Sequence, residues 1–253
     1  MALSQLYVSK IYVKDTLPKN TYYAKLPMIQ SLKGEGLNLV KPVTVLVGEN
    51  GIGKSTLMEA IAVSLGFNPE GGTKNFNFHT EDSHSDLWKY ITVGRSRYFQ
   101  DGFFFRAESF YNFASYIDQN DRDPDNLRDG AAGIIRSYGG TSLHRKSHGE
   151  SFLTLVRERL GGHGIYIFDE PEATLSPASI LTLMVEMDRL IKNDSQLVIA
   201  THSPILMAFP NADILQMTEK GIQRIPYYET EHFQLTKAFV NDPEHMFRYL
   251  FEN

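Results

Sequence analysis

Residues 43–56 read VTVLVGENGIGKST, and this stretch decides the fold. An apolar run precedes Gly48, a glycine-rich loop follows it, and the run LMEAIAVSL comes directly after the loop. The loop fits G-x-x-x-x-G-K-[ST] in the context that this pattern requires, with a strand before it and a helix after it. Average composition produces the pattern by chance in only about one chain in a hundred of this length. The stretch therefore predicts a phosphate-binding loop at a helix N-terminus.

The residue types of this loop suit a nucleoside triphosphate. Glycines let the backbone curl so that successive N–H groups converge on a phosphate, and the helix dipole adds a favourable potential for the anion. Lys54 supplies a cation to the β- and γ-phosphates, and the Ser55 hydroxyl can ligate Mg²⁺. The loop residues predicted to contact the nucleotide are Asn50, Gly51, Gly53, Lys54, Ser55 and Thr56.

Composition narrows the class of protein. The chain has 253 residues, 42% of them hydrophobic and 22% charged, which is typical of a globular protein with one large α/β domain or two small ones. The net charge of −5 gives no support to a nucleic acid partner, although a local basic groove is compatible with it. The absence of cysteine excludes disulfides and thiolate chemistry. No apolar run approaches the length of about 20 residues that a membrane span needs, and we expect a cytoplasmic protein.

Strand and helix signals alternate around the loop, which predicts a mainly parallel sheet covered by helices. The predicted strands lie at residues 5–14, at two places within 28–47, and at 87–99, 102–107, 165–170 and 196–203, followed by a late hairpin from ADILQM and GIQRI. The predicted helices run from the loop to Gly66, over 108–138 with a polar break, over FLTLVRERL, over 177–193 and over 229–252.

Two carboxylates end the apolar strand at 165–170. Open α/β sheets place their ligands at the carboxyl ends of strands. A first carboxylate there can hold Mg²⁺ through its water shell, and a second can orient or deprotonate the water that attacks the γ-phosphate. We assign the first role to Asp169 and the second to Glu170. Glu172 can share the role of base, but Glu170 follows Asp169 directly and is preferred.

Two further places carry polar groups that suit phosphate. His202 lies in ATHSP at another strand end, where it is either a structural histidine or, as we prefer, a sensor of the γ-phosphate. Ser147 and Gly149 lie in SHGES, which opens a predicted helix just before the carboxylate strand. Small residues at a helix N-terminus make either a second anion site or a plain helix cap, and both interpretations stay open.

The ordered set GENGIGKST, SHGES, IYIFDEPEATLSP and ATHSP resembles the motifs of ABC-type ATPases. Stretches such as DGFFFRAESFYN and YGGTSLHRKSHGESFL are similar to a group of stand-alone bacterial predicted ATPases, and this similarity covers nearly the whole chain from residue 22 onward. The resemblance implies one ABC-type P-loop domain over 1–253, with a mainly parallel sheet flanked by helices. Its implied parts are an antiparallel β subdomain with the loop (1–105), a small helical subdomain with the signature (106–160), and the second half of the sheet with the C-terminal helices (161–253).

The resemblance also implies that two copies sandwich two ATP molecules. Ser147 and Gly149 would then contact the γ-phosphate bound by the partner copy, and residues around Leu175 would cross the dimer seam. SHGES departs from the SGGQ that is usual in transporters, which makes the trans contact less secure. The glutamine that usually follows the strand is missing, and Glu108 is the preferred replacement as a Mg²⁺ or water contact, with Gln100 as a second candidate.

An aromatic residue upstream of the loop stacks on adenine in the family. Tyr23 is our choice for this role and Tyr22 is the alternative, while a core or surface tyrosine remains an equal interpretation for either.

The implied function is Mg²⁺-dependent ATP hydrolysis by a stand-alone ATPase whose homodimer acts as a switch on an unknown protein partner. One alternative is the ATP-binding subunit of an ABC transporter, and another is a compact DNA-repair or defence-type ATPase head. A long coiled-coil arm of the SMC type is excluded, because Glu108 and Ser147 are only about forty residues apart and no heptads are sustained between them.

Overall fold

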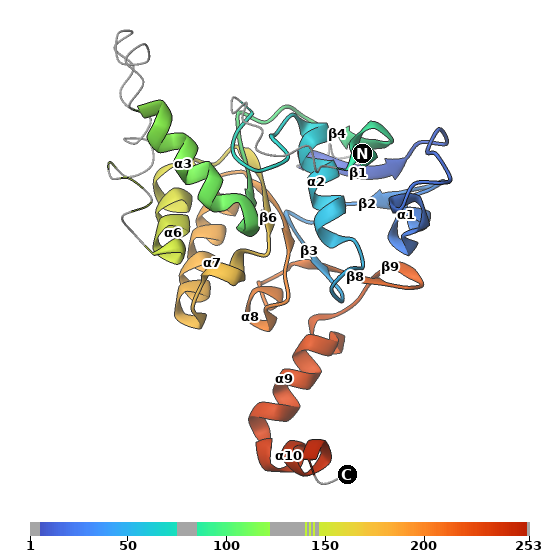
Figure 1. Cartoon of the computed structure of the whole chain (residues 1–253), viewed down its shortest axis with the longest axis vertical. Coiled ribbons are helices and arrows are strands. Elements are labelled where there is room, and N and C mark those ends of the chain that lie inside the picture. Colours follow the sequence, from blue (N-terminus) through green and yellow to red (C-terminus); the bar gives the residue numbers. More distant parts are fainter. Residues whose placement is uncertain are drawn as a thin grey trace.

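The structure is a computed structural model that describes residues 6–74, 85–121, 140, 142, 144 and 147–251 (Figure 1). At the centre of these residues is a sheet of six strands in the order β5-β6-β7-β3-β8-β9. The first five of these strands are parallel, and β9 runs antiparallel to β8. The strands are β3 (Val43–Val47), β5 (Asp101–Arg106), β6 (Gly164–Asp169), β7 (Gln196–Ala200), β8 (Asp213–Thr218) and β9 (Gly221–Arg224). The mainly parallel sheet and the late hairpin are confirmed.

Helices cover both faces of this sheet (Figure 1). One face packs against α2 (Lys54–Leu65) and α1 (Pro27–Ser31), and the other against α3 (Phe110–Asp121), α6 (His148–Glu158), α7 (Pro177–Lys192) and α8 (Pro204–Met207). Strand side chains alternate between the two cores, so that Phe104 packs with α2 while Phe103 and Phe105 pack with α3 and α6. Burial on both faces explains why these strands are almost continuous apolar runs.

A second, antiparallel sheet lies on the α2 side and confirms the antiparallel β subdomain (Figure 1). Its strands are β1 (Val8–Val13), β2 (Leu37–Asn38) and β4 (Ile91–Arg95), in the order β2-β1-β4. Buried residues of β1 and β4 share one apolar core with α2 and with the large sheet. The small sheet therefore supports the helix that begins at the phosphate loop.

The expected strand at the start of 28–47 is wrong, because α1 occupies Pro27–Ser31. Pro27 stands at the first position of this helix, where its fixed φ is compatible with helical backbone. Met28, Ile29 and Leu32 are 0% exposed. Their spacing places all three apolar side chains on one face of the helix, where they pack into the core. In a strand, only alternate residues would face the core.

The chain ends in α9 (Glu231–Asn241) and α10 (Pro243–Phe251), which extend away from the sheet (Figure 1). We call residues 231–251 the C-terminal arm. No residue within these two helices is buried. The terminal helices predicted over 229–252 are confirmed, whereas the part of the predicted helix at 108–138 beyond Asp121 lies outside the described residues. Across the described ranges, no helix combines the length and the apolar character that crossing a membrane demands.

Candidate active site

The predicted phosphate loop connects the end of β3 to the start of α2. Gly53 is the N-cap of α2 with φ +101°, in the left-handed region that favours glycine. A Cβ at Gly53 would lie 2.9 Å from Leu26 Cδ1 and equally close to Met28 Cε, so the segment before β2 packs directly against the loop. Asn50 and Gly51 are exposed at the tip of the loop, and Thr56 is half-buried in the first turn of the helix. The loop has the local geometry that the motif predicts.

Lys54 is folded back onto this loop. Its side chain is buried, and Nζ donates hydrogen bonds to the carbonyl oxygens of Gly48 at 2.8 Å and of Glu49 at 3.0 Å. Burial lowers the pKa of the Lys54 ammonium group, against the attraction of Glu170 and Asp169 that raises it. The loop carbonyls thus hold this cation where the loop curves, within reach of a phosphate bound by the loop amides.

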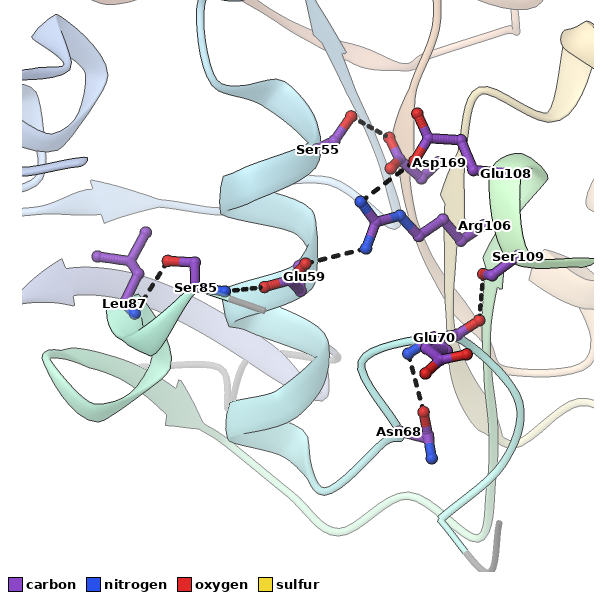
Figure 2. Close-up of polar contacts among 10 residues, drawn as sticks. All are labelled: Ser55, Glu59, Asn68, Glu70, Ser85, Leu87, Arg106, Glu108, Ser109 and Asp169. Atoms are coloured by element: carbon purple, nitrogen blue, oxygen red, sulfur yellow. Dashed lines mark hydrogen bonds and ion pairs between the residues drawn. The ribbon is translucent and has the colours of Figure 1, made fainter. Parts of the chain in front are cut away.

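Ser55 and Asp169 form the pair of oxygens expected to hold Mg²⁺. The Ser55 hydroxyl donates to Asp169 Oδ1 at 3.2 Å, and Asp169 is 3% exposed at the end of β6 (Figure 2). Burial raises the pKa of the Asp169 carboxyl to about 7, while Arg106 and the Ser55 hydroxyl lower it. Within the described parts of the chain, acidic and histidine side chains form no cluster of three that could hold a metal ion. A hydroxyl and a carboxylate still fit Mg²⁺, because this ion takes few protein ligands and completes its shell with phosphate and water oxygens.

Arg106 is the residue of this region that sequence reasoning missed. It ends β5, and the parallel register places it beside Asp169. Its Nη1 lies 2.9 Å from Oε2 of Glu59, which is 7% exposed, and its Nη2 lies 3.3 Å from Oε2 of Glu108 (Figure 2). The signal was present in the sequence, since FFFRA and YIFDE are strands whose polar ends can align.

Glu108, the predicted replacement for the missing glutamine, lies in the same cluster (Figure 2). Its side chain is 82% exposed and paired with Arg106. A Mg²⁺ or water contact for Glu108 therefore stays a prediction, with Arg106 as its present partner. The second candidate, Gln100, precedes β5 and lies at the opposite end of that strand from Arg106. The position of Gln100 does not fit the role.

Glu170 follows Asp169 with φ +51°, a conformation that is uncommon outside glycine. Its amide donates to the carbonyl of Ala200 at 3.0 Å, and its Oε1 lies 3.9 Å from His202 Nε2. The alternative base, Glu172, instead accepts a hydrogen bond from the backbone N–H of His202. The strained backbone thus directs Glu170 toward the histidine, which favours Glu170 over Glu172 as the base.

His202 follows β7, the strand between β6 and β3. Its Nδ1 lies 3.1 Å from Nε2 of His232, which belongs to α9. Its Nε2 is buried and has no hydrogen-bond partner among the described residues. An imidazole nitrogen without a partner, 3.9 Å from the Glu170 carboxylate, is placed to meet an incoming group such as a phosphate oxygen.

Two family models match the chain. Residues 28–124, which include the phosphate loop, match a family described as an AAA domain. Residues 151–208, which run from α6 past His202, match a family described as an AAA domain, putative AbiEii toxin, Type IV TA system. Both segments of the chain are thus similar to AAA domains. Comparison with curated proteins found no match.

Several solved structures resemble the fold of this chain. The structure of cbiO1 from Clostridium perfringens, part of the ABC transporter complex cbiONQ, is 19% identical over 97% of this chain and 100% of that chain, with a TM-score of 0.47. An SmcHead bound to the C-winged helix domain of ScpA is 13% identical over 87% and 97% of the two chains, with a TM-score of 0.47. An ATP-binding subunit of an ABC transporter is 14% identical over 93% and 100%, with a TM-score of 0.43. These likenesses concern the fold, and the similarity to AAA domains comes from the two family models.

The SHGES segment begins α6 with a capping box. The Ser147 hydroxyl accepts a hydrogen bond from the Glu150 amide at 3.3 Å, and the Glu150 carboxylate accepts one from the Ser147 amide at 3.0 Å. A Cβ at Gly149 would lie 2.5 Å from the carbonyl oxygen of Thr174. The helix cap is confirmed, and glycine is required by the close approach of the 171–174 turn. The contact of Ser147 and Gly149 with a partner's nucleotide stays a prediction.

The two tyrosines upstream of the loop differ in exposure. Tyr23 is 5% exposed and lies in the core with its ring centroid 6.5 Å from that of Tyr90. Tyr22 is 62% exposed. A ring must offer a free face to stack on adenine, so the structure corrects the choice of Tyr23 and favours the alternative, Tyr22.

Proposed function

We propose that this ATPase binds Mg·ATP at residues 50–56 and hydrolyses it to ADP and phosphate. The observation that carries the proposal is the convergence of the predicted groups at one edge of the sheet. The loop follows β3, Asp169 and Glu170 end β6, and His202 follows β7, and these three strands are neighbours. Parallel strands bring their carboxyl ends to the same edge, where α/β proteins bind their ligands.

In this proposal, each residue of the site has its own role in ATP binding or hydrolysis. Lys54 binds the β- and γ-phosphates, and Ser55 with Asp169 would hold Mg²⁺, which neutralises phosphate charge when bound. Glu170 orients the attacking water and accepts its proton as the water oxygen bonds to the γ-phosphorus. The bond from that phosphorus to the bridging oxygen breaks, and ADP leaves with the electron pair. His202 contacts the γ-phosphate through Nε2 and responds to its loss.

A second copy of the chain completes the site in this proposal. Ser147 is exposed at the N-terminus of α6, where the helix dipole suits an anion. Ser176 is exposed as the N-cap of α7, directly after Leu175 in the segment that would cross the seam. ATP would close this homodimer and hydrolysis would open it, so that the ATPase acts as a switch on an unknown protein partner.

The test uses Glu170→Gln, with Lys54→Ala as the control that removes nucleotide binding. We expect the Gln variant to bind Mg·ATP in calorimetry, to lose at least about 100-fold in phosphate release, and to double its mass in light scattering when Mg·ATP is added. Unchanged hydrolysis by Lys54→Ala would overturn the assignment of the loop. A persistent monomer with ATP bound would overturn the homodimer and leave nucleotide binding intact.

A further inference from the structure

The root of the C-terminal arm, residues 231–233, contacts His202, the proposed sensor of the γ-phosphate. Nε2 of His232 lies 3.1 Å from Nδ1 of His202, and the two ring centroids are 5.3 Å apart. His202 in turn points Nε2 toward Glu170, at 3.9 Å from Oε1. The side chains of Glu170, His202 and His232 therefore form a row of three polar groups.

His232 is held in place by a well-built helix start. Thr230, the N-cap of α9, is 0% exposed, and its hydroxyl donates to the Tyr227 carbonyl at 2.8 Å and accepts from the Phe233 amide at 3.3 Å. The Phe233 ring packs on Tyr227 at 4.7 Å and on Tyr228 at 5.1 Å between centroids. The root of the arm is thus anchored, whereas the rest of the arm is exposed.

The surroundings of His232 favour its neutral form. A neutral imidazole donates from one nitrogen and accepts at the other. Burial, followed by the neighbouring His202, lowers the pKa of His232, with Lys54 acting in the same direction and Glu231 against it. His232 also stands in the first turn of a helix, where the dipole disfavours a cation. A neutral His232 can donate from Nε2 to His202 Nδ1, which leaves the His202 proton on Nε2, facing the Glu170 carboxylate.

We propose that His232 is a positioning residue of this ATPase. It fixes the ring of His202 with Nε2–H directed at the γ-phosphate, and it links the C-terminal arm to the nucleotide site. This inference rests on the proposed function, because it concerns the same switch histidine. His232 also lines a cavity of about 520 Å³ together with Glu49 and Lys220, so the arm root has space on this side. Coupling between two sites is reciprocal for binding, so a partner of the arm that strengthens ATP binding would itself be bound more tightly when ATP is present, by the same factor.

A kinetic test compares His232→Ala with His232→Gln, whose side-chain amide can donate from a similar position. The control is His245→Ala, which removes an exposed histidine from the arm itself. We expect His232→Ala to lower kcat for ATP at least about 10-fold with KM within about 2-fold, and His232→Gln to recover most of the loss. Adding His232→Ala to His202→Ala should lower kcat no further, because the first residue acts through the second.

A spectroscopic test does not depend on activity. The ¹⁵N shifts of the His202 ring report its tautomer, and we expect the proton on Nε2 in the unmodified chain and a mixture of tautomers in His232→Ala. A wild-type ring with its proton on Nδ1 overturns the inference, as does an active enzyme whose kcat is unchanged by His232→Ala. If the unmodified chain binds ATP without hydrolysing it, the proposed hydrolysis fails, and the tautomer still decides the role of His232.

Discussion

We expect Asp169→Asn to have a higher free energy of unfolding than the unmodified chain, without metal or nucleotide, by a margin that grows from acid to neutral pH. Asp169 is 3% exposed, and its pKa rises from 3.8 to about 7 because burial disfavours the carboxylate. Asn has nearly the same shape and carries no charge. The substitution therefore removes the cost of keeping a buried carboxylate ionised.

The sign and size follow from proton linkage. With its pKa raised, the folded protein binds more protons than the unfolded chain between about pH 4 and pH 7, so its free energy of unfolding falls as the pH rises through this window. The shift of about 3 pKa units corresponds to about 4 kcal/mol when the window is complete. Between about pH 5 and pH 7 we expect the unmodified chain to lose about 2 kcal/mol relative to Asp169→Asn.

Urea unfolding with a chelator present measures this difference at each pH. Glu170→Gln is the matched control, because it makes the same chemical change at the next residue, whose side chain is 41% exposed. The control measures how much of the gap comes from replacing a carboxylate by an amide at a more exposed position. A gap between Asp169→Asn and the unmodified chain that stays constant within about 0.5 kcal/mol from pH 5 to pH 7 would refute the buried-carboxylate argument.

Three other substitutions test the packing around the site. Gly149→Ala should lower the free energy of unfolding by about 1–3 kcal/mol, because its Cβ would meet a backbone carbonyl at 2.5 Å. Gly161→Ala should change it by less than about 0.5 kcal/mol, because no atom of the described residues lies within 4 Å of its Cβ, and equal values for the two variants in urea unfolding contradict the close approach. Arg106→Ala should lower the free energy of unfolding by about 2–3 kcal/mol, because the buried carboxylate of Glu59 loses its ion pair. If the double variant with Glu59→Ala loses the full sum of the two single losses in the same assay, the two residues are not paired. Phe152→Ala should cost about 3–5 kcal/mol, since the ring is 0% exposed; a thermal midpoint lowered by less than about 3 °C contradicts this.

The sequence predicts the sheet well, because its strands obey simple physical rules. Strands buried on both faces must be apolar throughout, and the runs that contain Phe103–Phe105 and Ile165–Phe168 are. Polar residues that end such strands meet at one edge, which is why Asp169 and His202 could be assigned from the sequence. The phosphate loop is equally local, since its glycines and Lys54 act within one turn of chain.

The errors fall where local sequence carries too little information. Helix α1 spans five residues, and an apolar segment this short fits a strand or a helix. The choice between Tyr22 and Tyr23 depends on which ring faces the core. Two adjacent tyrosines form no hydrophobic pattern that would show which of them is buried.

Long-range polar contacts explain the remaining omissions. Arg106 pairs with Glu59 across 47 positions of chain, and His202 meets His232 across 30. Neither partner has a spacing that marks it in advance, because the contact exists only after the strands and the arm root have been placed. Arg106 and His202 thus contact residues that lie outside the motifs.

The N-terminus of α6 packs against the turn that follows Glu170, and the ABC resemblance gives these two segments different roles. SHGES is expected to reach the nucleotide of a second copy, and Glu170 is expected to act on the nucleotide of its own chain. The turn at Pro171–Thr174 begins directly after Glu170, and its last carbonyl leaves no room for a methyl group at Gly149. The turn and the first turn of α6 are therefore closely packed at this point. Packing within one chain therefore explains why this position of SHGES is glycine, without any contact with a phosphate bound by a partner copy.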